Sequence, residues 1–288
     1  MKILDFQNNG LGDVILGCWI IESAQRVNEM VYVNPRNHRA ITEMLNMPEE
    51  NITYESGGNW TQLPDSGFNH ELQRAHEVSL NRFQFWTHSI GLEGLTPVRP
   101  QFTADEHAKN WAQDEWNKVC NKDAPKIIIL PEATRVTRSW PMIYWLDLAQ
   151  KLKNDYNVCV MALNSQVARR FDVYHFWGMP LNNFAAMVDQ ADLVISADSG
   201  GAHLAATLKT PVIALQGPTI GHVVFGHDEY AHPMHVSKEQ VPCVACNFSE
   251  SHGYTPICND GCQALYLLSP LEVMNKVKEL VPKGVEVS

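Results

Sequence analysis

Ala191-Asp-Leu-Val-Ile-Ser-Ala-Asp-Ser-Gly-Gly-Ala-His-Leu-Ala-Ala206 is the stretch that decides the fold class of this protein. It opens with a short apolar run rich in β-branched residues, which is typical of a strand buried on both faces. It then passes through Asp-Ser-Gly-Gly into small residues that indicate a helix. A buried strand that feeds a helix through glycines is the repeating unit of a parallel sheet covered by helices.

Strand and helix signals alternate on both sides of this stretch. Strands are predicted at 2–6, 30–33, 51–55, 127–130, 158–163 and 212–215, and helices at 14–26, 38–46, 71–90, 105–119, 141–152, 165–172, 183–190 and 270–280. This order predicts an α/β fold with two similar halves, and the short polar segment 120–125 is the expected boundary between residues 1–123 and 124–288. Residues 217–265 are expected to form one long loop.

The composition bounds the class of protein. Of the 288 residues, 45% are hydrophobic and 19% charged, enough to build packed cores. The net charge of −10 divides into −7 over residues 1–123 and −3 over residues 124–288. Because nucleic acids are bound through lysine and arginine, this acidic balance disfavours them as partners. No apolar run reaches the length of a transmembrane helix, and the first residues do not resemble a signal peptide, so we expect a soluble, cytoplasmic protein.

The turn Asp198-Ser-Gly-Gly201 is the first candidate site. It stands where a predicted strand ends and a helix begins, so free backbone N–H groups and the helix dipole favour an anion such as phosphate. Gly200 and Gly201 would let a diphosphate approach the backbone closely. The alternative is a tight turn capped by Asp198 or Ser199. His203 alone is as consistent with a histidine packed in the core.

A second candidate is the loop 131–141, which also follows a predicted strand and carries Thr134, Arg135 and Arg138. Open parallel sheets bind ligands beyond the carboxyl ends of their strands, where both this loop and the turn at 198–201 are expected. The planar guanidinium of Arg138 suits phosphate oxygens. The alternative is a solvated loop.

A third candidate is the turn Gly10-Leu-Gly-Asp13 after the first predicted strand. It is not a dinucleotide-binding fingerprint, because G-x-G-x-x-G would need a glycine at Ile15. It does place the carboxylate of Asp13 at the start of a helix, where the dipole favours the charged form. Asp13 is therefore a candidate general base, with a plain N-terminal cap as the alternative.

Together these motifs resemble glycosyltransferase family 9, the heptosyltransferase group, whose GT-B architecture has two Rossmann-like domains facing a cleft. Gly10-Leu-Gly-Asp13 is similar to its G-x-G-D turn, and Arg138-Ser-Trp-Pro141 to its K-x-W-P element. Asp198-Ser-Gly-Gly-Ala-His203 is similar to its D-[ST]-G-x-x-H element, and Gly217-Pro-Thr219 to its G-P-T element. These elements lie in the family's order along the chain. Residues 27–125 carry no such motif, and the chain is short in its acceptor-binding half.

The resemblance implies an inverting, metal-independent transfer of a sugar from a nucleotide-diphosphate donor to a hydroxyl acceptor. Residues 1–123 would bind the acceptor and residues 124–288 the donor, with no cofactor for catalysis. By position, Asp13 would be the base, and Arg138, where the family has lysine, would neutralise the leaving diphosphate. The resemblance assigns the remaining positions to the donor site (Thr134, Arg135, Asp198, Ser199, Gly200, Gly201, His203, Thr219) and to an acceptor-side turn (Gly10, Gly12).

The cysteines near the C-terminus follow the spacing Cys243-x2-Cys246-x11-Cys258-x3-Cys262. Two close pairs of thiolates are suited to one tetrahedral, structural zinc ion, with His252 as a competing ligand. Free thiols on a loop are an equally good interpretation, and a redox or catalytic role is a third.

Several functions remain open from the sequence alone. The acceptor is a glycan or lipopolysaccharide in one hypothesis and a hydroxymethylated DNA base in another. The aromatic run Phe83-Gln-Phe-Trp86 would suit stacking on either a sugar or a base. Two further hypotheses are a nucleotide-sugar epimerase and a non-catalytic protein that binds nucleotide sugars.

Overall fold

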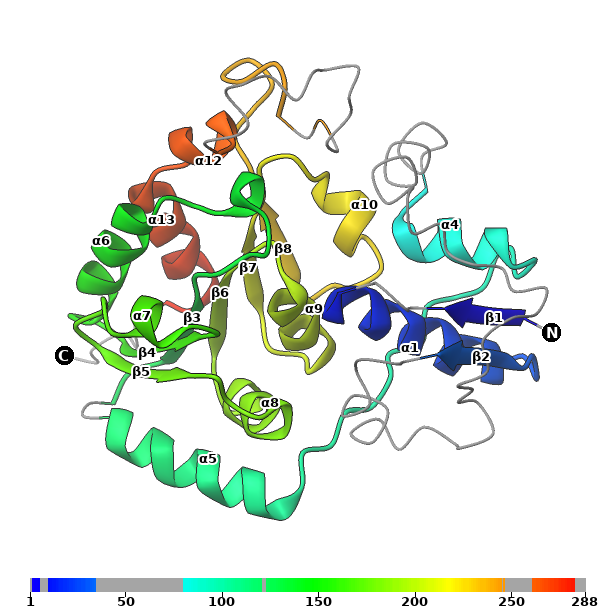
Figure 1. The fold of residues 1–288 in the computed structure, drawn as a ribbon, viewed down its shortest axis with the longest axis horizontal. Coiled ribbons are helices and arrows are strands. Elements are labelled where there is room, and N and C mark those ends of the chain that lie inside the picture. Colours follow the sequence, from blue (N-terminus) through cyan, green and yellow to red (C-terminus); the bar gives the residue numbers. More distant parts are fainter. Residues whose placement is uncertain are drawn as a thin grey trace.

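The larger sheet of the protein has six parallel strands in the order β5-β4-β3-β6-β7-β8 (Figure 1). The computed structural model describes residues 2–5, 10–34, 80–120, 123–244, 246 and 261–282. The strands of this sheet are β3 (Lys126–Leu130), β4 (Asn157–Ala162), β5 (Tyr174–Trp177), β6 (Leu193–Ala197), β7 (Val212–Leu215) and β8 (Ala231–Met234). Counted from β3, the order is 3-2-1-4-5-6, that of the Rossmann fold, so the winding direction reverses between β3 and β6.

The central strands of this sheet form because their side chains are buried on both faces. Ile127, Ile128 and Ile129 of β3 are fully buried, and Ile129 pairs with Ile195 of β6. Burying one such side chain stabilises a fold by about 1.5–3 kcal/mol. The carboxyl ends of β3 and β6 therefore lie side by side in a rigid part of the molecule.

Helices cover both faces of the six-stranded sheet. One face carries α5 (Glu106–Val119), α8 (Leu181–Asp189), α9 (Gly200–Thr207) and α10 (Gly221–Phe225), and the other carries α6 (Met142–Leu152), α12 (Gln263–Leu267) and α13 (Pro270–Leu280). Two short helices, η2 (Val136–Arg138) and α7 (Ser165–Ala168), complete this part. Helix α5 precedes the predicted boundary at residue 123 but packs with the larger sheet. Trp116 Nε1 on α5 donates to the carbonyl of Met187 on α8 at 3.1 Å.

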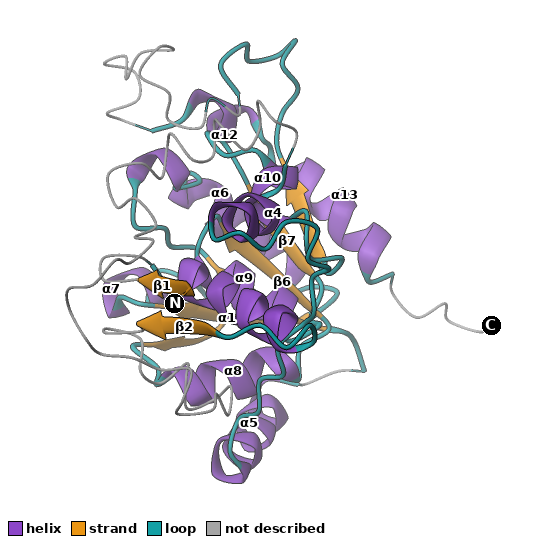
Figure 2. Ribbon diagram, turned by 90° about the vertical axis from the view of Figure 1, so that its right-hand side faces the viewer, coloured by secondary structure: helices purple, strands orange, loops and turns teal. Residues whose placement is uncertain are grey.

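The N-terminal part contains two parallel strands, β1 (Lys2–Asp5) and β2 (Val31–Asn34), connected by α1 (Leu11–Gln25). The helix α4 (Arg82–Ser89) packs against α1. Helix α1 is apolar on nearly every side, as expected of a helix that is covered all round. Both ribbon views show α1 lying beside α9, so the N-terminal part is joined to the larger sheet through a pair of helices (Figure 2).

The structure confirms most of the predicted elements and corrects others. Residues 217–265 are not one long loop, since α10, β8 and the start of α12 lie there. The helix predicted at 165–172 ends at Ala168, and β5 follows it. The helix at 38–46, the strand at 51–55 and the first part of the helix at 71–90 lie outside the described residues. Within the described part of the chain, no helix combines the length and apolarity that crossing a membrane requires.

Candidate active site

Two helix N-termini, those of α1 and α9, lie side by side at the carboxyl end of β6. A Cβ atom added to Gly200 would lie 2.6 Å from Cβ of Leu11 and 3.1 Å from the backbone nitrogen of Gly12. In return, a Cβ atom on Gly12 would lie 2.6 Å from Cδ2 of His203. Each glycine therefore makes room for the opposite helix. The structure brings the predicted turns at 10–13 and 198–201 together.

Gly201 has a similar steric role. A Cβ atom there would lie 2.7 Å from Cδ1 of Leu130, the last residue of β3. The sequence suggested that Gly200 and Gly201 leave space for a diphosphate. In the structure, their missing side chains instead allow the turn to pack against α1 and β3. A ligand can still use the backbone N–H groups at the start of α9, which have no partners within the helix.

Asp13 stands in the first turn of α1 with both carboxylate oxygens engaged. Oδ2 accepts a hydrogen bond from the backbone N–H of Gly10 at 3.1 Å. Oδ1 lies 2.5 Å from Nη2 of Arg82, the first residue of α4. The side chain of Asp13 is 13% exposed, so the carboxylate remains accessible at one edge. Arg82 was not singled out from the sequence, although it immediately precedes the aromatic run that was.

The other predicted carboxylate, Asp198, has a structural partner. Its Oδ2 accepts a hydrogen bond from the hydroxyl of Thr219 at 2.7 Å, and both side chains are buried. This bond ties the turn after β6 to the loop after β7. The hydroxyls of Ser196 and Ser199 lie 3.3 Å apart in the same turn. Asp198 and Thr219 therefore lie together, as the sequence suggested, but Asp198 is occupied by holding the two loops.

The loop after β3, the strand paired with β6, carries Arg138 on η2. Its Nη2 atom donates to the hydroxyl of Thr134 at 2.8 Å. Trp140 anchors the loop, because its indole Nε1 donates to the carbonyl of Leu268 at 2.8 Å and its ring is buried. Thr134 and Arg135 are exposed. Arg138 is thus a half-buried cation at the point where the winding direction of the sheet reverses.

Two histidines, the buried His203 and the half-buried His227, lie near the arginines of the site. Burial lowers the pKa of His203 well below its ordinary value, and the neighbouring His227 lowers it further. The charges of Arg82 and Arg138 act in the same direction on this pKa. Burial likewise lowers the pKa of His227 to about 3. Both imidazoles are neutral at pH 7, so His203 adds no positive charge to the site.

The aromatic run at 83–86 does not form a stacking surface. Phe83 and Trp86 are fully buried between α4 and α1, so they cannot stack on a sugar or a base. Trp86 instead lies under the guanidinium of Arg82, whose Cζ atom is 4.5 Å from the ring centroid. The prediction failed because aromatic residues in a helix serve the core as readily as a ligand.

The cysteine cluster is only partly described. Cys258 and His252 lie outside the described residues, while Cys243 is exposed and Cys246 and Cys262 are half-buried. Burial raises the pKa of the Cys262 thiol, with smaller contributions from Cys246 and Cys243. Within the described ranges, no group of three or more His, Cys, Asp or Glu side chains is placed to hold a metal ion. The structural zinc stays a prediction.

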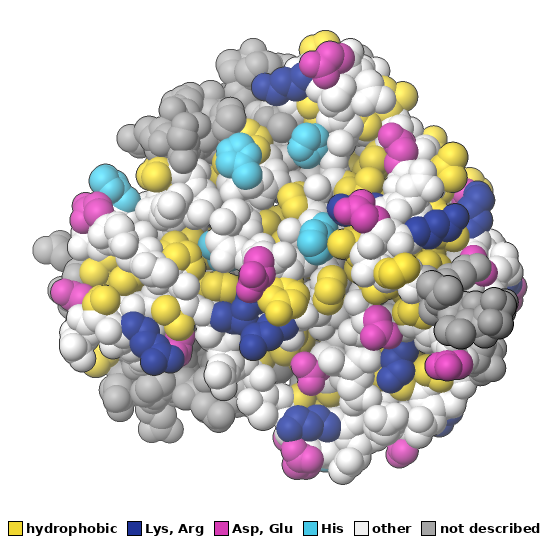
Figure 3. Space-filling model, turned by 180° about the vertical axis from the view of Figure 1, so that it is seen from behind, with side chains coloured by type: hydrophobic (Ala, Val, Ile, Leu, Met, Phe, Trp, Pro, Cys, Tyr) yellow, Lys and Arg dark blue, Asp and Glu magenta, His cyan; other side chains and the backbone are white. Residues whose placement is uncertain are grey.

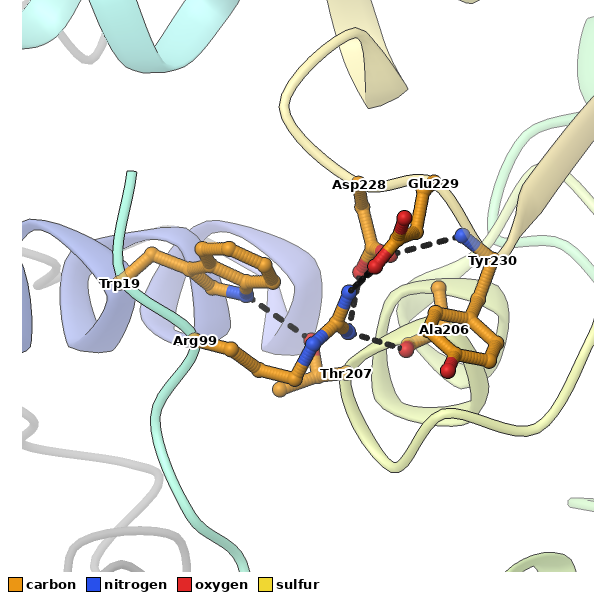
Figure 4. A network of polar contacts seen from close by, with 7 residues as sticks. All are labelled: Trp19, Arg99, Ala206, Thr207, Asp228, Glu229 and Tyr230. Carbon is orange, nitrogen blue, oxygen red and sulfur yellow. Dashed lines mark hydrogen bonds and ion pairs between the residues drawn. The ribbon is translucent and has the colours of Figure 1, made fainter. Parts of the chain in front are cut away.

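A cavity of about 590 Å³ lies beside the middle of α1, near the carboxyl end of α9. It is lined in part by Trp19, Arg99, Phe225, His227 and Asp228. Figure 4 shows how Arg99 crosses from the segment after α4 to contact both the end of α9 and the loop before β8. None of the predicted site residues in the described ranges lines this cavity, which is therefore separate from the paired helix N-termini.

Charge on the molecular surface is mixed. On the face drawn in Figure 3, lysine and arginine side chains lie scattered among acidic ones and do not gather into one stripe. Binding to a nucleic-acid backbone depends on clustered cations. This face of the described residues therefore offers no surface suited to a duplex.

Solved structures with a similar fold are glycosyltransferases of the GT-B class. The structure of E. coli ADP-heptose LPS heptosyltransferase II matches with a TM-score of 0.63 at 14% identity, covering 97% of this chain and 98% of that one. The glycosyl transferase family 9 structure from Veillonella parvula gives 0.64 at 12% identity, covering 97% and 96%. The iron-containing dodecameric glycosyltransferase TibC from enterotoxigenic E. coli gives 0.65 at 14%, covering 97% and 78%. At these identities the comparison shows the fold.

The family follows from the sequence itself. The sequence model of glycosyltransferase family 9 (heptosyltransferase) matches residues 63–247, which is more than half of the chain. The chain belongs to this family, and the protein is a glycosyltransferase. No curated protein matches it.

Proposed function

We propose that this protein transfers a sugar from a nucleotide-diphosphate donor to a hydroxyl group of a glycan or lipopolysaccharide acceptor, with inversion at the anomeric carbon and without a metal ion. Family membership supports the transfer of a sugar. A structural neighbour with a TM-score of 0.52, the E. coli heptosyltransferase WaaC, is described with ADP-2-deoxy-2-fluoro heptose, which supports a nucleotide sugar as donor.

The observation that carries this proposal is the pairing of the N-termini of α1 and α9. It places the Asp13 carboxylate beside the turn at 198–201 at the end of β6. A general base and a diphosphate cradle on neighbouring helix ends are the two parts that direct transfer needs. The acceptor hydroxyl would lie at Asp13, and the donor diphosphate at the start of α9.

The proposed reaction is a single displacement. The acceptor oxygen attacks the anomeric carbon while the bond from that carbon to the diphosphate oxygen breaks, and the electron pair leaves with the diphosphate. The acceptor proton passes to Oδ1 or Oδ2 of Asp13. A double displacement would need a second carboxylate as nucleophile. Asp198 is buried and bonded to Thr219, so it does not suit that role, and a single displacement inverts the anomeric carbon.

Positive charge and hydrogen-bond donors are provided for the leaving group by the chain itself. Arg138 lies close enough to α9 for its charge to lower the pKa of His203, and the backbone N–H groups of Gly200 and Gly201 begin α9. Fixed donors at the place where negative charge develops stabilise the transition state without reorganising. These groups support the proposal that the diphosphate departs without a metal ion.

A donor panel tests the proposal. The protein is incubated with ADP-, GDP-, UDP- and dTDP-sugars and truncated lipopolysaccharide, with and without EDTA, and nucleotide release and the anomeric configuration of the product are measured. We expect one nucleotide class to turn over equally with EDTA and to give an inverted product. Arg138→Ala should weaken donor binding and turnover together. A retained configuration, or turnover abolished by EDTA, contradicts the proposal.

A further inference from the structure

Arg82 is a buried cation directly attached to the proposed base. Its side chain is 3% exposed, and Nη2 lies 2.5 Å from Oδ1 of Asp13. A buried charge is stable only when it is paired, because its removal from water carries a penalty of several kcal/mol. Asp13 supplies the pairing charge. The pair therefore joins α4 to α1 at the start of α1.

The first turn of α4 is built to hold Arg82 in one place. Asn81 caps the helix: its Oδ1 accepts from the backbone N–H of Gln84 at 2.9 Å, and its own N–H donates to Oε1 of Gln84 at 3.0 Å. One turn later, the fully buried ring of Trp86 lies under the guanidinium. A cation over an indole face gains about 0.5–2 kcal/mol and loses freedom of orientation. Arg82 is thus fixed by its own helix before it meets Asp13.

Among the described residues, Arg82 on α4 is the cation shown in direct contact with the Asp13 carboxylate. Burial lowers the pKa of His203 on α9 and of His227 after α10, and the charge of Arg82 lowers both further, so the two imidazoles are neutral at pH 7.

We propose that Arg82 is the positioning residue of this enzyme: it orients the Asp13 carboxylate so that the free lone pairs face the acceptor hydroxyl. This inference rests on the proposed role of Asp13 as base. Oδ1 is held by Arg82 and Oδ2 by the N–H of Gly10, which fixes the carboxylate plane. A carboxylate has about four lone-pair positions, so a hydroxyl can still donate to it.

This arrangement has a measurable signature. Without Arg82 the carboxylate of Asp13 loses the contact that fixes its plane. A variant without Arg82 should therefore have a lower kcat and an unchanged KM for the donor.

The experiment compares Arg82→Gln, Arg82→Lys and the matched control Arg26→Gln, an exposed arginine 3.5 Å from Glu22. First, the carboxyl resonance of Asp13 is recorded by NMR at about pH 7 in protein labelled at aspartate Cγ, with Asp13→Asn for assignment. We expect its chemical shift to change in Arg82→Gln, because the contact with the guanidinium is lost, and to stay unchanged in Arg26→Gln. An unmoved resonance in folded Arg82→Gln overturns the proposal, whether or not the enzyme turns over.

Second, kcat and KM are measured with the donor that turns over in the panel. Arg82→Gln should lose about tenfold or more in kcat. Addition of guanidinium ion should restore part of this loss. Arg82→Lys should also lose kcat, because lysine keeps the charge without the planar fork. Full kcat in Arg82→Lys overturns the orienting role, and this variant carries the test if Arg82→Gln does not fold. Unimpaired turnover of Asp13→Asn instead refutes the proposed base, independently of the NMR result.

Discussion

Helices α1 and α9 pack side by side, and the backbone groups at the two ends of α9 have different surroundings. At the amino ends, Gly12 and Gly200 bring the backbones together and leave N–H groups and the Asp13 carboxylate at an accessible edge. At the carboxyl end of α9, which lies against the middle of α1, Trp19 Nε1 donates to the hydroxyl of Thr207 at 3.0 Å, and Arg99 Nη1 donates to the carbonyl of Ala206 at 2.6 Å (Figure 4).

The difference follows from the polarity of helices. The amino end carries partial positive charge and suits an anion, whereas the carboxyl end suits a cation. Arg99 fills the carboxyl end of α9 and is itself paired with Asp228 at 2.9 and 3.1 Å, so this helix terminus is closed, with the cavity of about 590 Å³ beside it. At the amino ends, Asp198 precedes α9 but is bonded to Thr219, and Asp13 is paired with Arg82. The open end is the proposed place for a ligand, and the closed end holds the helices in register.

The largest effect is expected at the open end, from Asp13→Asn. Loss of a general base lowers turnover by about 10²–10⁴-fold. The same variant leaves the buried Arg82 without its counter-charge, so the free energy of unfolding should fall by about 1–3 kcal/mol. The double variant Asp13→Asn/Arg82→Gln separates the two effects: stability in urea should recover while turnover does not. Recovery of turnover in the double variant would show that Asp13 supports activity by stabilising the structure and not as a general base.

At the closed end, Arg99→Ala should act on stability. Removing one partner of a buried ion pair destabilises by about 3–5 kcal/mol, and Asp228 is only 2% exposed against 16% for Arg99. Because Arg99 is partly exposed, we expect a loss near 3 kcal/mol in urea unfolding. The control is Lys153→Ala, which breaks the exposed 2.7 Å pair with Asp172 and should cost about 1 kcal/mol or less. Equal losses in the two variants would contradict the closed-end interpretation.

The close approach of the helices at the open end can be tested with an added methyl group. Gly200→Ala would place its Cβ atom 2.6 Å from Cβ of Leu11, and overpacking of this kind destabilises by about 1–3 kcal/mol. Gly10→Ala is the matched control, since its Cβ atom would meet no described atom within 4 Å. Calorimetric unfolding should separate the two variants. Similar melting temperatures would mean that the helices are not held this close.

The smallest effect concerns pH, through His227, which lies between the two ends and contacts Trp19 at 5.0 Å between ring centroids. Its pKa is about 3 in the folded protein and about 6.5 when unfolded. The unfolded chain therefore binds more protons below pH 6.5, and stability should fall with decreasing pH by about 1.4 kcal/mol per unit. His227→Phe should reduce the slope between pH 6 and 5 and leave the part that comes from His203, whereas the exposed His88→Gln should not change it. An unchanged slope in His227→Phe would refute this origin.

In the larger sheet, the strands that the sequence predicted are the ones whose side chains are buried. The strands β3, β6 and β7 were predicted because their side chains are buried and form continuous apolar runs. The edge strands β5 and β8 were missed, since their residues are half-exposed and β8 contains Pro233, which an edge strand tolerates and a central strand does not. The same reason explains why residues 217–265 looked like one loop.

The sequence by itself determined the α/β order, the family and the positions of Asp13 and of the turn at 198–201, because each is a local pattern of a few adjacent residues. Only the tertiary structure decided which distant residues contact one another. Arg82 reaches Asp13, and Arg99 reaches Asp228 across 129 residues, through helices whose packing no local pattern records. It also decided why the motif glycines are there: a side chain at either position would collide with the opposite helix, and contact between distant segments is visible only once the chain has folded.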